Sequence, residues 1–167
     1  MATRKKNDLA NTPTENSAQA ETRGLTLLGG KTHYTYAGPD RKMLEAFPNR
    51  FPERDYVIRF EYPEFTSLCP MTGQPDFGTI VVTYVPGECC VESKSFKLYM
   101  GAFRNHGAFM ESLTNTIASD LEALLRPRRL TVEGIFNVRG GTGISVRVEI
   151  VSPGLDAARK EALRQLW

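Results

Sequence analysis

Cys69 and Asp76 are the residues whose types and spacing best suit catalysis. They flank a short stretch that contains Pro70, Gly73 and Pro75. A nucleophilic thiol needs exposure, thiolate character and a nearby proton carrier. A rigid turn could bring the Asp76 carboxylate back to Cys69, so that the pair attacks an electrophilic carbon and protonates the neighbouring atom. The alternative is structural, because a lone cysteine beside a strand is usually buried and an aspartate in such a stretch is usually a turn residue.

A second cluster, residues 92–99, opens a predicted helix. Glu92 or Ser93 could simply cap that helix. Lys94 and Lys97 lie close to the predicted helix N-terminus, where they could also form a phosphate-binding surface. Both interpretations remain open from the residues alone.

A third candidate is Glu111, in the first turn of a longer predicted helix. The helix dipole favours an acidic residue there for structural reasons. A carboxylate in this place could also accept two parallel N–H bonds from the edge of a guanine-like base.

The elements that must position these residues follow a simple order. Apolar residues recurring at three and four positions predict two helices, and β-branched and aromatic runs predict strands on either side of them. A Pro- and Gly-rich loop is expected between the first two strands, and a short helix from Leu155 onward should dock Leu163 and Trp167. The predicted strands cover 56–62, 79–85, 130–138 and 144–151, and the loop covers 65–78.

Strands segregated from helices predict an α+β domain, with a four-stranded antiparallel sheet and two helices on one face. Such a sheet has two free edges, and the predicted strands are not short. Edges of this kind are commonly paired with neighbouring subunits, so we expect a closed homo-oligomer.

Composition limits the possible classes of protein. The 167 residues, 41% hydrophobic and 24% charged, fit one domain over 25–167 preceded by a flexible tail over 1–24. A net charge of +2 does not argue for nucleic acid, and no apolar run approaches the roughly 20 residues that span a bilayer. Three cysteines, an odd number, favour free thiols in the cytoplasm.

Two familiar kinds of site are not expected. His33 and His106 are the only histidines, and the spacing of metal ligands is missing, so we expect no metal. The glycines over 140–143 join two predicted strands rather than a strand and a helix, so they do not form a dinucleotide-binding fingerprint. Any dinucleotide site must therefore be built outside a Rossmann fold.

Three blocks together resemble one family, the NADPH-dependent 7-cyano-7-deazaguanine reductases of queuosine biosynthesis, in their single-module form. The blocks are residues 67–77, 92–99 and 103–111, and the resemblance extends over 40–152. It implies the tunnelling fold, in which subunits join their sheets into ring barrels, two rings stack, and active sites lie between subunits.

The resemblance also implies a mechanism. Cys69 attacks the nitrile carbon of the deazapurine substrate to give a covalent thioimide, and Asp76 delivers a proton to the nitrile nitrogen. Two NADPH molecules, acting as co-substrates, then reduce the carbon to the primary amine of 7-aminomethyl-7-deazaguanine. The resemblance places Val91, Glu92, Ser93, Met110 and Glu111 at the substrate, and Lys94 and Lys97 at NADPH.

One position departs from the family pattern. A histidine usually precedes the base-binding glutamate, whereas this chain has Met110. Methionine cannot make a strong hydrogen bond, so either His106 or water takes that role, or the rate and the affinity differ.

Two other classes of function compete with a nitrile reductase. One is a relative with the same fold: a zinc-dependent pterin cyclohydrolase would need ligands that this chain lacks, and an amidine-forming relative would share Cys69 and Asp76 but would not need residues 92–99. The other is a ring-forming scaffold or base-binding protein, in which Cys69 would be dispensable.

Overall fold

The computed structural model describes residues 22–31 and 37–167. The predicted flexible tail, 1–24, lies outside these residues except for 22–24.

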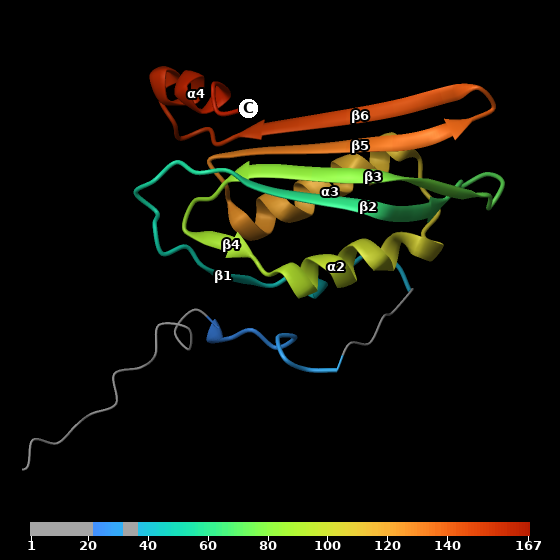
Figure 1. Ribbon diagram of the computed structural model, residues 1–167, viewed down its shortest axis with the longest axis horizontal. Helices are drawn as coiled ribbons and strands as arrows, with labels where there is room; N and C mark the ends of the chain where they lie inside the picture. The colour runs from blue at the N-terminus through green and yellow to red at the C-terminus, as the bar shows by residue number, and fades with distance from the viewer. Residues whose placement is uncertain (1–21, 32–36) are drawn as a thin grey trace, which may run out of the picture.

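A four-stranded antiparallel sheet forms one layer of the molecule (Figure 1). Its strands lie in the order β2-β3-β5-β6, so β2 and β6 are the edges. Their bounds are β2 Ile58–Leu68, β3 Pro75–Val85, β5 Arg129–Arg139 and β6 Thr142–Val151. The predicted α+β class, the four-stranded antiparallel sheet and the order of its strands and the two helices along the chain are therefore confirmed. A small second sheet pairs β1 (Ala46–Pro48) with β4 (Cys89–Val91), and the sequence predicted neither strand.

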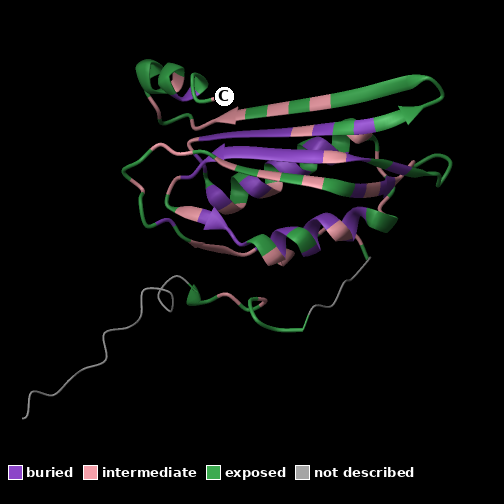
Figure 2. Cartoon of the chain, viewed as in Figure 1, coloured by how far each residue is buried: buried purple, intermediate pink, exposed green. Residues whose placement is uncertain are grey.

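The helices α2 and α3 lie on the same face of the sheet (Figure 1). α2 spans Ser93–Gly101 and continues as a 3-10 turn, η2, over Ala102–Asn105, and α3 spans Met110–Leu125. Another 3-10 turn, η1, covers Arg41–Met43. Figure 2 shows that buried residues concentrate on β3, β5 and the sheet-facing sides of the helices, whereas β6 is largely exposed.

The long helix α3 forms because its apolar residues recur at helical spacing. Leu113, Ile117, Leu121 and Leu125 are all buried against the sheet. The helix ends at Arg126, which adopts the left-handed conformation with φ 44°, directly before a proline.

The last helix, α4 (Ala157–Arg164), is held against the sheet by Arg129. This buried guanidinium donates to the Leu163 carbonyl at 2.8 Å and to Glu149 at 2.9 Å, and its Cζ atom lies 4.0 Å from the centroid of the Trp167 ring. The prediction that Leu163 and Trp167 dock on the domain is confirmed.

The predicted loop over 65–78 is wrong at both of its ends. β2 continues to Leu68 and β3 begins at Pro75, so the connection covers only 69–74. Pro63 does not end the strand, because β2 is an edge strand and a missing N–H can face solvent there. The chain also accommodates one extra residue between Tyr62 and Phe65 as a β-bulge.

Two bulges change which face the strands present at one end of the sheet. On β2, Tyr62 pairs with Ile80 but Phe65 pairs with Gly78, so three steps on one strand oppose two on the other. Side chains alternate in a strand, and the extra residue turns Phe65 and Ser67 to the helix-covered face, where both are buried. β5 has the same kind of irregularity between Phe136 and Arg139.

Candidate functional site

The turn between β2 and β3 places Cys69. The Cys69 N–H donates to the Gln74 carbonyl at 2.8 Å, and the Gly73 N–H donates back to the Cys69 carbonyl at 2.9 Å. Gly73 has φ 69°, a left-handed conformation that favours glycine. Leu68 is also bonded through its backbone to His106 and Ala108, in the segment that leads into α3. The turn is therefore closed on itself and fixed to a neighbouring segment.

The Cys69 thiol is half-buried and its electrostatic environment favours the thiolate. Its pKa is lowered to about 7, first by a hydrogen bond from the Thr72 side chain, then by the Thr72 and Met71 backbone, with a smaller contribution from Arg139. Burial instead raises the pKa of Cys89 and Cys90. Of the cysteines, Cys69 has the properties of a nucleophile.

Asp76 lies on β3 rather than in the loop where the sequence placed it, directly opposite Ser67. Both residues are buried on the helix-covered face, and Asp76 is 7% exposed. The Asp76 carboxylate forms an ion pair with Arg139, with Oδ1 2.7 Å from Nη1. Among the described residues, the Ser67 hydroxyl is a buried side-chain oxygen without a hydrogen-bond partner, which leaves it free to bond a water or a ligand.

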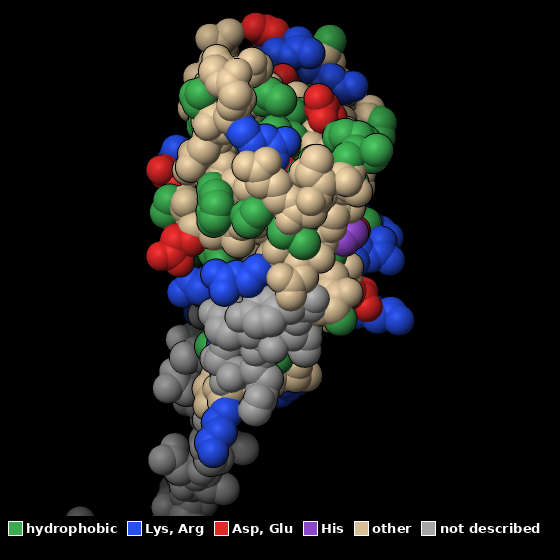
Figure 3. All heavy atoms as spheres, turned by 90° about the vertical axis from the view of Figure 1, so that its right-hand side faces the viewer, with side chains coloured by type: hydrophobic (Ala, Val, Ile, Leu, Met, Phe, Trp, Pro, Cys, Tyr) green, Lys and Arg blue, Asp and Glu red, His purple; other side chains and the backbone are tan. Residues whose placement is uncertain are grey.

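Met110 and Glu111 form the first turn of α3. Glu111 is exposed, and Met110 is partly buried against the core. Because Gly107 pairs with Leu68, this turn lies at the same end of the molecule as Cys69. Figure 3 looks onto this end, where basic and acidic side chains are mixed with apolar ones.

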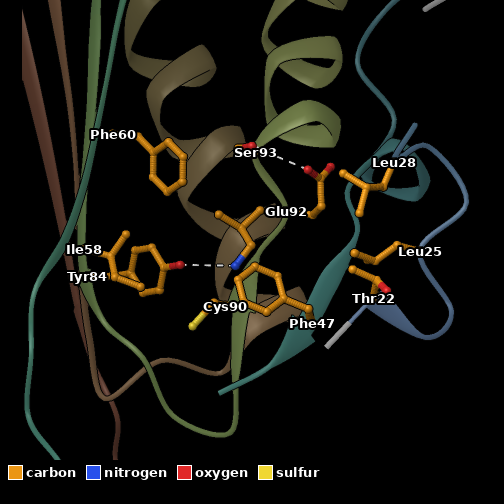
Figure 4. A pocket seen from close by; sticks show the side chains of 11 residues that line it. Thr22, Leu25, Leu28, Phe47, Ile58, Phe60, Tyr84, Cys90, Glu92 and Ser93 are labelled. Carbon is orange, nitrogen blue, oxygen red and sulfur yellow. Dashed lines mark hydrogen bonds between the residues drawn. The ribbon is translucent and has the colours of Figure 1, made fainter. Parts of the chain in front are cut away.

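Val91, Glu92 and Ser93 line a separate pocket of about 330 Å³ (Figure 4). The Tyr84 hydroxyl accepts a hydrogen bond from the Val91 N–H at 3.1 Å. Glu92 is the N-cap of α2, as its carboxylate accepts from the N–H groups of Lys94 and Ser95 at 2.8 and 2.7 Å. The remaining walls are largely apolar and consist of Thr22, Leu25, Leu28, Phe47, Ile58, Phe60, Tyr84 and Cys90.

The two predicted cofactor lysines differ in their surroundings. The Lys94 ammonium donates to the Leu27 and Gly30 carbonyls at 2.8 and 2.6 Å, so it holds the 22–31 segment beside the pocket. Lys97 is exposed. Both charges suit phosphate, but Lys94 would have to exchange these carbonyl oxygens for phosphate oxygens.

One chain does not bring all the predicted site residues together. Ile58 and Tyr84, which line the pocket, pair at one end of the β2–β3 hairpin, whereas Leu68 and Pro75 pair at the other end, next to Cys69. At about 3.3 Å per residue, the two ends lie roughly 30 Å apart. In Figure 1, β4 accordingly lies on the left and the β2–β3 turn on the right. Cys69, Asp76, Met110 and Glu111 share one end, while Val91, Glu92 and Ser93 lie far from it.

Sequence reasoning missed three residues around the nucleophile: Ser67, Thr72 and Arg139. Thr72 lies close to Cys69 in the sequence, so a predicted turn could have suggested that the two side chains interact. Arg139 directly precedes Gly140 and Gly141, whose φ values of 60° and 80° form a tight hairpin turn. The glycine pair could have predicted that Arg139 lies at the tip of a hairpin. The bulge that determines which face Arg139 occupies was not predictable.

Over residues 22–31 and 37–167, His, Cys, Asp and Glu side chains do not form a group that could hold a metal ion. In the same residues, no helix is long and apolar enough to cross a membrane.

The structure defines an α+β domain with a thiol of lowered pKa at one end of its sheet, and comparison with known proteins assigns its family. The QueF-like protein family model matches residues 75–154. A solved structure, the archaeosine synthase QueF-Like in the apo form, superposes with a TM-score of 0.53 at 21% identity, covering 60% of this chain and 96% of that chain. This likeness confirms the predicted tunnelling fold of the subunit.

Close relatives specify the family. A protein from Nitratidesulfovibrio vulgaris (strain DP4), named NADPH-dependent 7-cyano-7-deazaguanine reductase, is 54% identical over 146 residues, which is 87% of this chain and 88% of the relative. A protein of the same name from Streptococcus mutans is 56% identical over 128 residues, or 76% and 78% of the two chains. This chain belongs to the family of NADPH-dependent 7-cyano-7-deazaguanine reductases.

Proposed function

We propose that this protein reduces the nitrile of 7-cyano-7-deazaguanine to the primary amine of 7-aminomethyl-7-deazaguanine, in queuosine biosynthesis. The observation that carries the proposal is the Cys69 thiol, with a pKa lowered to about 7, at the same sheet end as the buried Asp76 carboxylate. The family's name states the same chemistry for its relatives.

The first step joins Cys69 to the substrate. The Cys69 sulfur attacks the nitrile carbon, one C–N π bond breaks, and the nitrile nitrogen takes up a proton to give a thioimide. Asp76, present as a carboxylate in its ion pair with Arg139, accepts the thiol proton and passes it to that nitrogen. The proton count balances without an outside acid.

Reduction of the thioimide requires two hydride transfers. NADPH, when bound, supplies a hydride to the same carbon in each of two rounds. After the first, the C–S bond breaks, Cys69 leaves as thiolate and an imine remains. In the second, the imine carbon accepts a hydride and its nitrogen takes up a proton from solvent, which gives the amine. The chain holds the carbon in place through Cys69 in the first round and through its base-binding residues in the second.

Glu111 is the proposed anchor for the pyrimidine end of the base. Its carboxylate is exposed at the Cys69 end and can accept two parallel N–H bonds. Met110 beside it cannot replace a histidine as a donor. His106, whose carbonyl accepts from the Leu68 N–H, is close enough in the chain to take part instead.

We propose that the pocket of Val91, Glu92 and Ser93 completes the active site of another copy of this chain. The roughly 30 Å between this pocket and Cys69 is too long for one small base to span. β2 and β6 are free edges through which sheets could join into ring barrels, and two rings could stack. The same proposal places Lys94 and Lys97 at the NADPH phosphates. The free cysteine thiols of this chain suit the reducing environment of the cytoplasm.

The covalent step can be tested without NADPH. The intact protein is mixed with 7-cyano-7-deazaguanine, denatured and weighed by mass spectrometry, and the mass should rise by one substrate. Cys69→Ala should abolish the adduct, whereas Cys89→Ala, a matched removal of a half-buried thiol, should retain it. If no adduct forms, or if it survives Cys69→Ala, the proposed mechanism is wrong.

A further inference from the structure

Arg139 forms an ion pair with one of the residues proposed to react, and it affects the pKa of the other. Its Nη1 atom lies 2.7 Å from Asp76 Oδ1, and its guanidinium makes a small contribution to the lowered pKa of Cys69. The Asp76 side chain is 6% exposed and the Arg139 side chain 41% exposed. The buried member of this ion pair is therefore the carboxylate, and a buried carboxylate depends strongly on its partner.

Two local features bring Arg139 to this place. Gly140 and Gly141 make the tight turn that returns the chain, with Arg139 paired to Thr142. The β5 bulge after Phe136 shifts the alternation by one residue. As a result, Arg139 shares a face with Phe136 and with Asp76 on the neighbouring strand, instead of pointing to the opposite face.

The ion pair fixes the orientation of the Asp76 carboxylate at the sheet end where Cys69 lies. Without a cation, a carboxylate this buried would turn toward other donors or toward solvent. A proton relay between a thiol and a nitrile nitrogen needs its carrier within hydrogen-bond reach of both. Orientation of Asp76 therefore matters more to this reaction than its mere presence.

We propose that Arg139 is a positioning residue that holds the Asp76 carboxylate where it can accept the Cys69 proton and deliver it to the substrate nitrogen. This inference rests on the proposed function. Arg139 forms no bond to the substrate in this step. When Asp76 takes the thiol proton, the ion pair is weakened, and it re-forms when the proton passes to the nitrogen.

The test is the rate of adduct formation between the full chain and 7-cyano-7-deazaguanine, with NADPH left out so that cofactor binding cannot contribute. Arg139→Gln should slow the adduct about tenfold or more. Arg139→Lys, which retains a cation for the single contact, should recover part of the rate. Arg147→Gln is the matched control, because Arg147 is exposed on the opposite face of β6, and it should react like the wild type.

A double-mutant cycle separates positioning from other roles. If Arg139 acts through Asp76, Arg139→Gln should add less than about a twofold loss to Asp76→Asn. The inference is overturned if Arg139→Gln reacts at the wild-type rate, if the two losses multiply, or if folded Arg139→Lys reacts no faster than Arg139→Gln. A wild-type protein that forms no adduct at all would instead overturn the proposed function, and this inference with it.

Discussion

At the scale of single residues, the β2–β3 turn lowers the pKa of the Cys69 thiol. Thr72 and the backbone at 71–72 hydrogen-bond Cys69 and lower its pKa to about 7, while Cys89 and Cys90 are shifted the other way by burial. A thiol with a pKa near 7 is about half thiolate at neutral pH, so a large fraction of it can react. The pKa is also high enough for the thiolate to remain a strong nucleophile.

This pKa predicts how Cys69 responds to pH. A lowered thiol pKa means that the reactive thiolate is lost as pH falls, so the rate of alkylation by iodoacetamide should rise with pH and reach half its maximum near pH 7. Thr72→Val removes the largest contribution and should move that midpoint to higher pH, whereas Thr72→Ser keeps a hydroxyl and should move it less. Labelled peptides identify Cys69 by mass spectrometry. An identical midpoint in Thr72→Val would contradict this account.

The sequence predicted roles for Cys69, Asp76 and Glu111 through motif resemblance, since such motifs carry side-chain chemistry directly. It did not identify Arg139 or Ser67, because their positions depend on bulges. A bulge is set by cross-strand pairing between distant segments, and alternation within one strand does not reveal it.

At the scale of elements, the packing of β2, β3 and β5 leaves no room for a side chain at Gly78. This glycine pairs with Phe65 on one side and Phe136 on the other, at the point where both bulges begin. A Cβ atom added there would lie 2.6 Å from the Ile135 carbonyl oxygen. A backbone oxygen cannot move aside to make room for the added methyl group, as the end of a flexible side chain could.

Gly78→Ala should therefore destabilise the protein by about 1–3 kcal/mol through overpacking against backbone. Gly154→Ala is the control, because a Cβ there meets nothing within 4 Å and the backbone is not left-handed. Chemical denaturation with a common m-value gives both free energies of unfolding. Equal stability for the two variants would refute the expected clash.

Element type was predictable for the regular parts of the chain. The two helices and the four strands of the main sheet were predicted, because helical and strand periodicities are local properties, as the buried stripe of α3 from Leu113 to Leu125 illustrates. The hairpin around Cys69 was not, because Pro63 and Pro75 are also typical of loops. Whether such residues lie in a strand depends on their being at an edge or a strand end.

At the scale of the whole molecule, the two groups of predicted site residues lie at opposite ends of one subunit. If the active site is shared between copies, a site fails when either contributor is missing, and two different defective chains can complement each other. The length of the β2–β3 hairpin supports this expectation, because it separates the two groups of residues within one chain.

Mixing Cys69→Ala with Glu92→Gln tests it. Each variant alone should be inactive or strongly impaired, and the amide introduced by Glu92→Gln retains an oxygen for capping α2. After the two chains are co-expressed in equal amounts, random assembly should restore about a quarter of wild-type activity. Cys69→Ala mixed with Asp76→Asn should restore none, because these two residues belong to the same end of one chain. Equal recovery in both mixtures would show that the site is not divided this way.

The extra residue in β2 also bears on how this hairpin can vary in length. Removing Glu64 would leave two steps on each strand between Tyr62 and Phe65, so the bulge would disappear while Phe65 and Ser67 kept the helix-covered face. Loss of two residues would instead put the rest of the strand out of phase and turn Phe65 and Ser67 to the other face. Tolerance to deletion here should therefore depend on whether the number of residues lost is odd or even, rather than on how many are lost.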